Sequence, residues 1–466
     1  MVFSSLLFIF RFLPVFLLVY YIAPRKYSNS ILLLGSLIFY SFGELKFLIL
    51  LLLSVIVNYF GTRKLDNTRN RIRRRTWLIV LLSYNFGMLF FFKYINFVIE
   101  NINHLIKSLW GFEGISPIAV VLPLGISFYT FQVVSYVINV YTKKLDAEES
   151  IFHFALYVCM FPQLISGPLV EYEDMSSQIM VRRFSVYNIE RGLKMFTLGL
   201  GCKVLIADRI GILWNDIQTI GFESISTPLA WLGAIGYSLQ LYFDFHGYTL
   251  MAIGVAEMLG FTLPSNFSHP YISRSVTEFW RRWHISLGKW FKNYVYIPLG
   301  GNRRGKGRLA FNLLVVWVLT GLWHGANWNF ILWGLSLYFL ILLEKLFLKD
   351  FLERHQVVSR IYIILVMPMT WMLFAITKLS DIKIYFGRLF GIVEGINVNT
   401  YDIIKYLDIY KWLFLAGIFF SIPIFDKWYR KHERSIPCMI LLFLIFWCCI
   451  YQLANSVNNP FLYFNF

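Results

Sequence analysis

The chain has 466 residues, of which 58% are hydrophobic and only 15% are charged, whereas about a quarter of the residues in soluble domains are charged. With apolar runs along its whole length, this composition excludes an ordinary soluble protein and predicts an all-α, polytopic membrane helix bundle that forms one domain over 1–466. The net charge of +17 does not indicate nucleic-acid binding, because the basic residues lie in short stretches beside apolar runs, where they set topology and contact anionic membrane lipids. The five cysteines lie in apolar segments without metal-ligand spacing, so we predict neither a metal site nor a bound cofactor.

The N-terminal third is predicted to contain four spans. The first lacks a basic start and a small-residue cleavage site, which indicates a retained helix rather than a signal peptide. Seven basic residues between 63 and 75 should be cytoplasmic, and so should Arg25 and Lys26, which places the N-terminus outside. The predicted spans are 3–22, 31–42, 47–60 and 77–97.

Two further apolar segments, 120–140 and 151–167, conflict with a simple topology. Lys143-Lys144 and Arg182-Arg183 both look cytoplasmic, which a single full crossing between them does not allow. One of the two segments is therefore predicted to be re-entrant, and the sequence leaves open which. Pro123 and Gly125 interrupt the start of the first segment, as expected of broken backbone that lines protein or water.

Residues 193–212 and 229–259 are the next predicted spans. The second contains a group of polar side chains at membrane depth, where an acidic group is costly unless it has a partner. Such a group is consistent with a functional site and equally with hydrogen bonding between packed helices. Its members are Gln240, Tyr242, Asp244, His246 and Tyr248.

Residues 276–294 have helical period and are predicted to form one interfacial amphipathic helix. A lone histidine on its apolar face would usually be structural, but His284 is one of two histidines on successive elements. The apolar face comprises Val276, Trp280, Trp283, His284, Leu287, Phe291 and Tyr294, and the opposite face Arg282, Ser286, Lys289 and Asn293.

A basic turn follows at residues 300–308 and is predicted to be cytoplasmic. Gly300 and Gly301 supply the turn, and four cations follow it. These cations are consistent with a topology signal and also with a landing site for a phosphorylated donor. They are Arg303, Arg304, Lys306 and Arg308.

The strongest candidate lies between two apolar arms, 309–323 and 328–343. His324 separates them, and an ionisable group at membrane depth is a functional candidate because its burial is costly. The alternative is a histidine bonded to a neighbouring carbonyl. Gly321 and Gly325 leave room for a ligand or another helix to approach. Basic residues at both outer ends of the arms place His324 at or near the far turn.

Three spans close the chain, at 361–376, 412–424 and 436–453. The basic stretch 426–434 is predicted to be cytoplasmic and the stretch 377–410 external.

Several motifs together are similar to the membrane-bound O-acyltransferase family, and within it to the bacterial alginate O-acetyltransferase branch. Any one of them is weak evidence, but their order and the length of the longest are specific. They are LPLGISFYTFQ from Leu122, FPQLISGPLV from Phe161, YSLQLYFDF from Tyr237, PYISRSVTEFWRRWHISLGKWFKNYVYIPLGGNR from Pro270 and LTGLWHGANWNFILWG from Leu319.

The resemblance implies about 11–13 membrane helices with re-entrant elements around a central tunnel, in a bacterial plasma membrane. The two functional histidines of the family match His324 and His284. The resemblance also implies that acetyl is taken from a cytoplasmic thioester, acetyl-CoA, and delivered to an extracytoplasmic polysaccharide or a partner transferase. The chain departs from the branch at His246, where serine is typical, and at Leu250, where aspartate is typical.

The chemistry requires a base that titrates near neutral pH, which suits imidazole. We predict that His324 is the general base at the tunnel constriction and that His284, nearer the cytoplasmic mouth, orients or activates the thioester. Asn327 or nearby backbone N–H groups are predicted to stabilise the oxyanion. The predicted donor-binding residues are Asn327, Trp280, Lys289, Arg303 and Arg304.

Three alternatives stay open at this point. One is transfer of D-alanine to teichoic acid within the same family. The second is a transporter, since ionisable residues in membranes also mark ion paths, although the hydropathy shows no inverted repeat. The third is an inactive scaffold that anchors a partner enzyme. The motifs describe the donor machinery, so the acceptor polymer is not identified.

Overall fold

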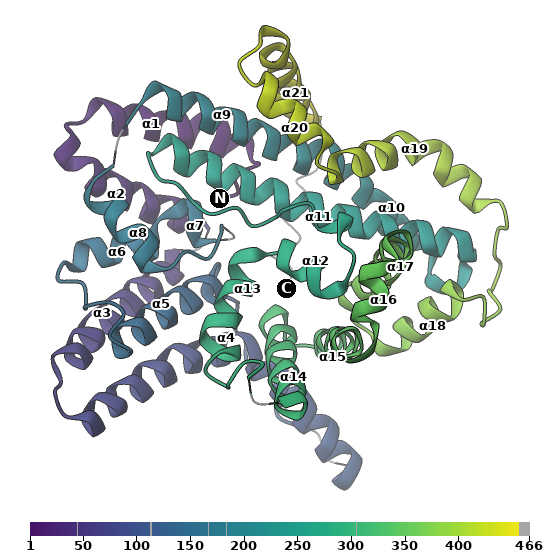
Figure 1. The fold of residues 1–466 in the computed structure, drawn as a ribbon, viewed down its shortest axis with the longest axis horizontal. Helices are drawn as coiled ribbons and strands as arrows, with labels where there is room; N and C mark the ends of the chain where they lie inside the picture. The colour runs from purple at the N-terminus through teal and green to yellow at the C-terminus, as the bar shows by residue number, and fades with distance from the viewer. Residues whose placement is uncertain (44, 112–113, 166, 183, 304, 456–466) are drawn as a thin grey trace. The chain divides into compact units, whose positions relative to one another are not determined.

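The computed structural model describes residues 1–43, 45–111, 114–165, 167–182, 184–303 and 305–455. These residues form helices joined by loops, with no strand among them (Figure 1). The chain divides into two compact units. The first is Met1–Gly192 with Val255–Pro264, and the second is Leu193–Gly254 with Ser265–Phe466. The single domain over the whole chain stays a prediction.

The first unit contains the N-terminal helices. They are η1 (Phe8–Phe12, a π-helix), α1 (Leu13–Ile22), η2 (Arg25–Tyr27), α2 (Ser28–Ser41), α3 (Leu45–Asn67), α4 (Arg71–Trp110), α5 (Ile126–Tyr141), α6 (Ile151–Cys159), α7 (Phe161–Leu164) and α8 (Tyr172–Met180).

The second unit contains the two candidate histidines, and the boundary between the units falls inside α9 (Val186–Gly201) and α11 (Thr227–Met258). Its other helices are η3 (Cys202–Ala207), α10 (Asp208–Ile220), η4 (Phe222–Ser224), η5 (Pro270–Ile272), α12 (Val276–Arg282), α13 (Ile285–Phe291), η6 (Lys292–Tyr296), α14 (Gly305–His324), α15 (Trp328–Leu343), η7 (Glu344–Leu348), α16 (Lys349–Arg354), α17 (Gln356–Ala375), α18 (Leu379–Leu389), α19 (Asp402–Ser421), α20 (Ile424–His432) and α21 (Ile436–Asn455).

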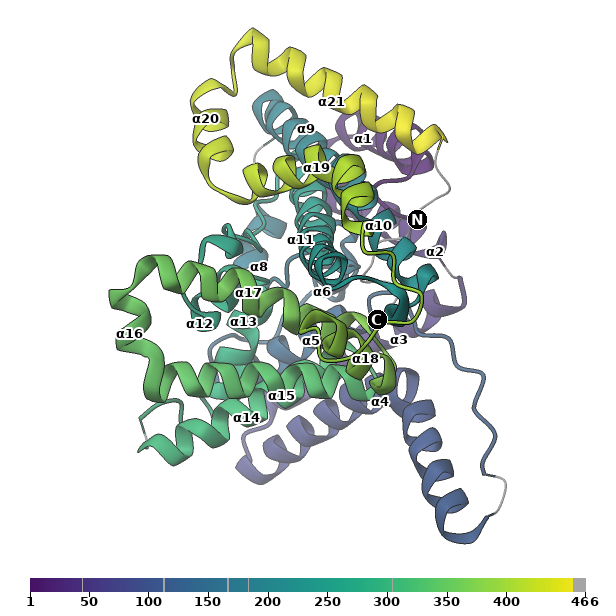
Figure 2. The same cartoon turned by 90° about the vertical axis from the view of Figure 1, so that its right-hand side faces the viewer.

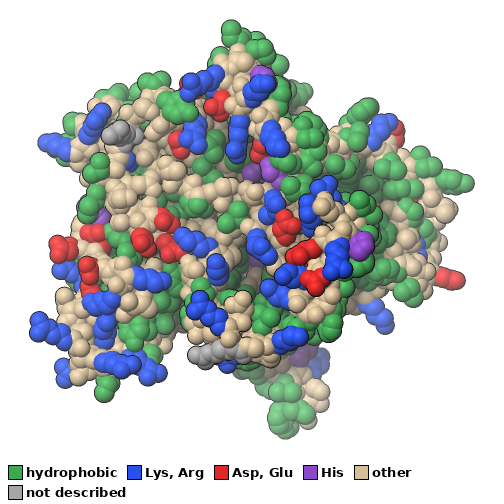
Figure 3. Space-filling model, in the orientation of Figure 1, with side chains coloured by type: hydrophobic (Ala, Val, Ile, Leu, Met, Phe, Trp, Pro, Cys, Tyr) green, Lys and Arg blue, Asp and Glu red, His purple; other side chains and the backbone are tan. Residues whose placement is uncertain are grey.

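Membrane-spanning helices are present, as predicted. Among the described residues, six helical segments are long and apolar enough to cross a bilayer: α3, α4, α14, α15 with its continuation to Arg354, α17 and α21. A seventh crossing results if α19 and α20, which meet at 70°, form one broken span. Large apolar side chains are exposed along these helices, and hydrophobic atoms are widespread on the surface (Figure 3). The structure confirms an all-helical membrane fold.

Helix α4 is about twice as long as the predicted span 77–97. It begins where the side chain of Asn70 accepts hydrogen bonds from the backbone N–H groups of Ile72 and Arg73, and it ends at Gly111, which has a φ of 69°. Asparagine caps and left-handed glycines are common helix ends. The apolar stretch alone underestimates the helix because polar residues extend it in both directions.

The segments 120–140 and 151–167 are both interrupted. Pro123 lies outside α5, and Gly125, with a φ of 76°, precedes its first residue, which confirms the predicted break. In the second segment the helix stops after nine residues at Cys159. Nine helical residues rise only about 13 Å, less than half of a bilayer core of about 30 Å. The short length of α6 therefore favours 151–167 as the segment that does not cross the membrane.

In the second unit α15 lies between α14 and α17 (Figure 2). Helices α14 and α15 form the predicted hairpin, and His324 is the last residue of its first arm. The prediction of one continuous helix over 276–294 is wrong. The chain forms two short helices, α12 and α13, separated by Trp283 and His284, and a π-helix follows from Lys292. The predicted polar face is also only partly correct, since Ser286 is buried while Lys289 is exposed.

Candidate functional site

His324 lies at the turn of the α14–α15 hairpin and is 5% exposed. Its ring contacts Trp333 of α15 and Phe374 of α17, with centroid separations of 4.9 and 5.1 Å. Both contacts are edge-to-face, the geometry preferred by aromatic pairs. Three helices therefore hold this imidazole in an aromatic environment.

Glycines bring the two arms of the hairpin into backbone contact. A Cβ at Gly334 would lie 2.4 Å from the carbonyl oxygen of Trp317, and one at Gly321 would lie 2.4 Å from that of Phe330. A Cβ at Gly325 would collide with the ring of Phe330. The room at Gly321 and Gly325 is thus taken by α15 and one of its side chains, as in small-residue helix contacts of membrane proteins.

His284 lies in the break between α12 and α13 and is 2% exposed. Its backbone has a φ of 44° and a ψ of 55°, a left-handed conformation that non-glycine residues rarely adopt. The ring is edge-to-face with Phe245 of α11 at 4.8 Å. Burial lowers the pKa of His284 to about 3, so the imidazole is neutral at physiological pH.

The two histidines meet at one tryptophan. The ring of Trp323 lies 5.9 Å from that of His284 and 4.8 Å from that of His324, between centroids. The two residues are 40 positions apart in sequence and lie on different elements of the same unit. Folding therefore brings together the two imidazoles that the sequence singled out.

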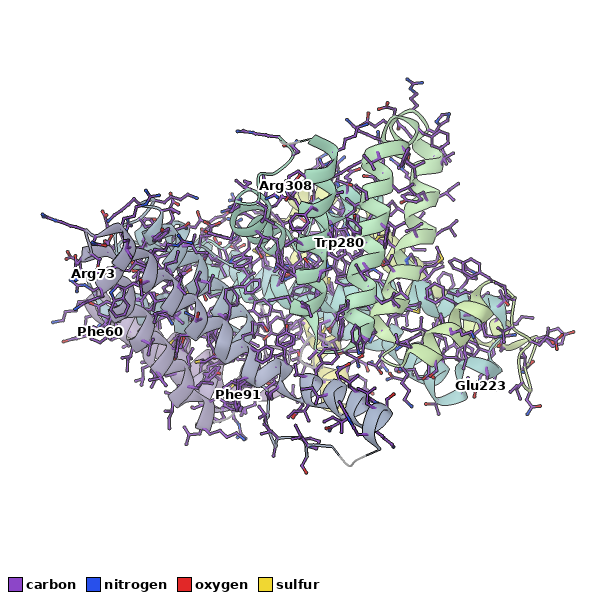
Figure 4. The ribbon with its side chains drawn as sticks, turned by 90° about the horizontal axis from the view of Figure 1, so that it is seen from below. Phe60, Arg73, Phe91, Glu223, Trp280 and Arg308 are labelled. Carbon is purple, nitrogen blue, oxygen red and sulfur yellow. The ribbon has the colours of Figure 1, made fainter. Side chains whose placement is uncertain are left out.

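Trp280 lies in a cluster of tryptophans beside the histidines. Its ring contacts Trp317 of α14 at 5.1 Å, Trp333 of α15 at 5.5 Å and Trp371 of α17 at 5.8 Å. Figure 4 shows Trp280 alongside these helices, displaced along them from Arg308 near the start of α14. Trp280 thus joins α12 to three helices of the hairpin region, and its role in donor binding stays a prediction.

Two sets of hydrogen bonds stabilise the N-terminus of α12. Ser275 accepts a hydrogen bond from the backbone N–H of Glu278, and the Glu278 carboxylate accepts one from the N–H of Arg274. This resembles a capping box. The buried carboxylate of Glu344 accepts hydrogen bonds from the backbone N–H of Val276 and from the N–H and hydroxyl of Thr277. Glu344 thereby anchors α12 to the end of α15.

The predicted donor-binding cations that the structure describes are exposed. Lys289 and Arg303 are exposed, and Arg304 lies outside the described residues. Figure 3 shows many Lys and Arg side chains over α12–α16, with some acidic side chains among them. Asn327 is partly buried, at the residue before α15, and its side chain makes no capping bond. Its oxyanion role stays a prediction.

The polar group on α11 has a partner that sequence analysis missed. Asp244 is 1% exposed and its carboxylate lies 2.7 Å from the ammonium nitrogen of Lys203, which is also buried. The same nitrogen lies 2.5 Å from the carboxylate of Asp208. A buried charge requires such pairing. The signal in the sequence was Lys203, a lysine in the middle of the predicted span 193–212, nine residues after Lys194 and five before Asp208.

His246, the departure from the branch pattern, packs within this helix and its neighbours. Its ring stacks on Tyr242 at 5.3 Å and meets Phe267 at 5.4 Å. Asp426 acts electrostatically on His246, and its carboxylate lies 3.0 Å from Nε2 of His269. The structure gives His246 no contact with His284 or His324 in the described aromatic pairs.

Comparison with known proteins gives a consistent result. The family model described as MBOAT, membrane-bound O-acyltransferase family, matches residues 145–380. A probable alginate O-acetylase of Pseudomonas putida is 35% identical over 100% of both chains. A peptidoglycan O-acetyltransferase of Helicobacter pylori is 40% identical over 72% of this chain and 68% of the relative. A teichoic acid D-alanyltransferase of Bacillus subtilis is 29% identical over 46% of this chain and 56% of the relative.

Proposed function

Because the chain belongs to the membrane-bound O-acyltransferase family, we propose that this O-acyltransferase carries acetyl from the cytoplasm to a polysaccharide outside the plasma membrane. The donor is a thioester, acetyl-CoA. The acceptor is a hydroxyl of the polymer or of a partner transferase that completes the delivery. The distribution of basic residues among the loops supports an N-terminus outside the membrane.

The observation that carries this proposal is the meeting of two buried imidazoles at Trp323. Both match histidines that the family resemblance marks as functional. A structural histidine needs no second imidazole nearby, whereas acyl transfer requires one group to take a proton and another to orient the reacting carbonyl. The convergence of His284 and His324 from separate elements supports the second interpretation.

In the proposed reaction His324 accepts the proton of the acceptor hydroxyl as its oxygen attacks the thioester carbonyl. The C–O bond forms, the C–S bond breaks, and the thiolate of the leaving group takes up the proton from the imidazolium. His284, neutral because burial lowers its pKa, orients the thioester by a hydrogen bond rather than by a charge. Asn327 supplies an oxyanion contact.

The donor is proposed to enter from the side of the basic turn. Lys289, Arg303 and Arg304 provide cations for the phosphates of acetyl-CoA. Trp280, which contacts Trp333 beside His324, provides an aromatic surface for the donor. The exposure of Lys289 and Arg303 supports this role, since phosphates must reach them from water.

Acetyl is favoured over D-alanine by the comparisons. The O-acetyl-transferring relatives align over 72% or more of this chain, and the D-alanyl relative aligns over 46%. The transporter and scaffold alternatives are not supported by any of these relatives. The relatives that act on alginate and on peptidoglycan differ in acceptor, so a polysaccharide is the shared class proposed here.

Purified protein in liposomes tests the proposal. With acetyl-labelled CoA on one side, label should reach an acceptor polysaccharide, or water by slow hydrolysis, and D-alanine should not replace acetyl. His324→Ala should lower the rate by about 10²- to 10⁴-fold. The matched control is His355→Ala, because His355 is exposed at the start of α17. Equal rates for both variants would disprove the role of His324.

A further inference from the structure

The backbone of His284 is held in a conformation that its own sequence does not favour. Left-handed backbone is unfavourable for a non-glycine residue and persists only when the surroundings enforce it. The ring contacts with Phe245 and Trp323 orient the imidazole but do not set φ. Hydrogen bonds to the backbone on either side of His284 can supply such a constraint.

Those hydrogen bonds come from the loop at residues 265–268. The backbone N–H of Ile285 donates to the carbonyl of Asn266 at 3.0 Å, and the N–H of Ser268 donates to the carbonyl of Arg282 at 3.0 Å. The loop thus pairs with the chain on both sides of His284. All of these residues belong to the second unit, and Asn266 and Ser286 are both buried.

The side chain of Asn266 completes the pairing. Its Oδ1 accepts a hydrogen bond from the backbone N–H of Ser286 at 3.1 Å and another from the Ser286 hydroxyl at 2.8 Å. A backbone N–H can only donate, so the amide orientation is determined. The Nδ2 atom has no hydrogen-bond partner among the described residues. The orientation of this amide therefore depends on its Oδ1 end alone.

The hydrogen bonds from Ser286 to Asn266 lie at the first turn of α13. Ser286 is the second residue of α13, whose first N–H groups have no partner within the helix. Asn266 therefore caps α13 from outside its own segment and fixes where the helix begins, one residue after His284. Without this cap, α12 and α13 are free to join into the continuous helix that their periodicity predicts, which would turn the imidazole away.

We infer that Asn266 is a positioning residue for His284: its side-chain oxygen caps α13 and keeps His284 in the left-handed break that directs its ring to Trp323. The inference deepens the proposed function, since it concerns the same site. It assigns to Asn266 no contact with substrate. The physical reason for a break instead of a helix is then this one amide together with the backbone pairing of its loop.

The first experiment compares Asn266→Leu with Asn58→Leu in the full-length protein. Leucine keeps the branched shape and the number of heavy atoms and removes both polar ends. Asn58 is equally buried and hydrogen-bonded to Asn85, but lies in the first unit, so it controls for the loss of a buried amide. We expect kcat to fall about 100-fold in Asn266→Leu, with the KM for acetyl-CoA nearly unchanged, as for a misplaced catalytic group. Asn58→Leu should retain its kcat, and equal kcat values for the two variants would overturn the inference.

A double-mutant cycle separates positioning from general damage. In a His284→Ala background Asn266→Leu should cause no further loss, because both changes remove the same contribution. Asn266→Asp keeps an acceptor oxygen and should recover kcat about tenfold over Asn266→Leu. A further loss in the His284→Ala background, or no recovery with Asn266→Asp, would overturn the inference.

A chemical measurement tests the inference even if the proposed reaction is wrong. Diethyl pyrocarbonate modifies accessible neutral imidazoles, and mass spectrometry locates the modified residue. His284 should be protected in the wild-type protein and in Asn58→Leu, and modified faster in Asn266→Leu. If His284 remains protected in Asn266→Leu, Asn266 does not position it, whatever the activity assay shows.

Discussion

The two histidines of the site are held by opposite means. His324 ends a regular membrane helix, and the hairpin around it is held by close contact of glycines with backbone. His284 lies in a break between two short helices, whose backbone N–H groups donate hydrogen bonds to the side chains of Asn266, at the start of α13, and Glu344, at the start of α12. One imidazole therefore depends on packing along the chain's regular structure and the other on polar contacts from distant segments.

The two positions should therefore respond differently to substitutions of the residues around them. Close helix contact is lost abruptly when volume is added, because packed backbones cannot move apart without losing their neighbours. A hydrogen-bonded break responds to the loss of single donors and acceptors, each worth about 1 kcal/mol.

Gly334→Val should produce little folded protein. The new Cβ would lie 2.4 Å from the carbonyl oxygen of Trp317, and neither backbone can shift without separating α14 from α15. We expect a loss of several kcal/mol. Gly307→Val is the control, because a Cβ at Gly307 meets nothing within 4 Å. Detergent size-exclusion profiles of the two variants provide the measurement, and a normal profile for Gly334→Val would contradict close helix contact.

Glu344→Gln should have a smaller effect that is confined to the break. The amide removes the negative charge at the start of α12 and replaces one acceptor oxygen by a donor beside the N–H groups of Val276 and Thr277. We expect destabilisation by about 1–2 kcal/mol. Thermal unfolding compared with Glu353→Gln, at an exposed position of α16, measures it. An unchanged transition would show that the charge does not anchor α12.

Replacement by glycine or by alanine should have opposite relative effects on stability at positions 284 and 324. At position 284 the positive φ favours glycine, so His284→Gly should be more stable than His284→Ala by about 1 kcal/mol. At position 324 the helical backbone favours alanine, so His324→Ala should be more stable than His324→Gly by a similar amount. The apparent melting temperatures of the four variants measure these differences. If glycine is more stable than alanine at both positions, or less stable at both, the two backbones do not differ in this way.

Acid should lower the stability of the folded protein because His284 is buried as a neutral imidazole. Its folded pKa of about 3 lies below the unfolded value of about 6.5, so the unfolded chain binds the proton first and stability falls as the pH drops through this window. Between pH 7 and pH 5.5 the loss should be about 1 kcal/mol. His284→Gln removes the titrating group and should lose less stability over the same interval. Equal losses in the two proteins would exclude this cause.

The sequence by itself determined the membrane class, the α14–α15 hairpin and the family. Apolar runs between basic stretches are local signals, and a helix in lipid must satisfy its own backbone, so 309–323 and 328–343 could be placed without knowing their neighbours. An ionisable group between two apolar arms marked His324, and the family resemblance matched both His324 and His284 to functional histidines. Their meeting at Trp323 agrees with that selection.

Only the tertiary structure decided the break at His284, the partner of Asp244 and the length of α4. Periodicity predicted one helix over 276–294 because the apolar residues recur at helical spacing on both sides of the break. The helix is interrupted by Asn266, and Asp244 is neutralised by Lys203, both through contacts between segments far apart in the chain. Such hydrogen bonds and ion pairs leave no periodic trace in the sequence, so they are found only when the folded chain shows which polar groups share a buried space.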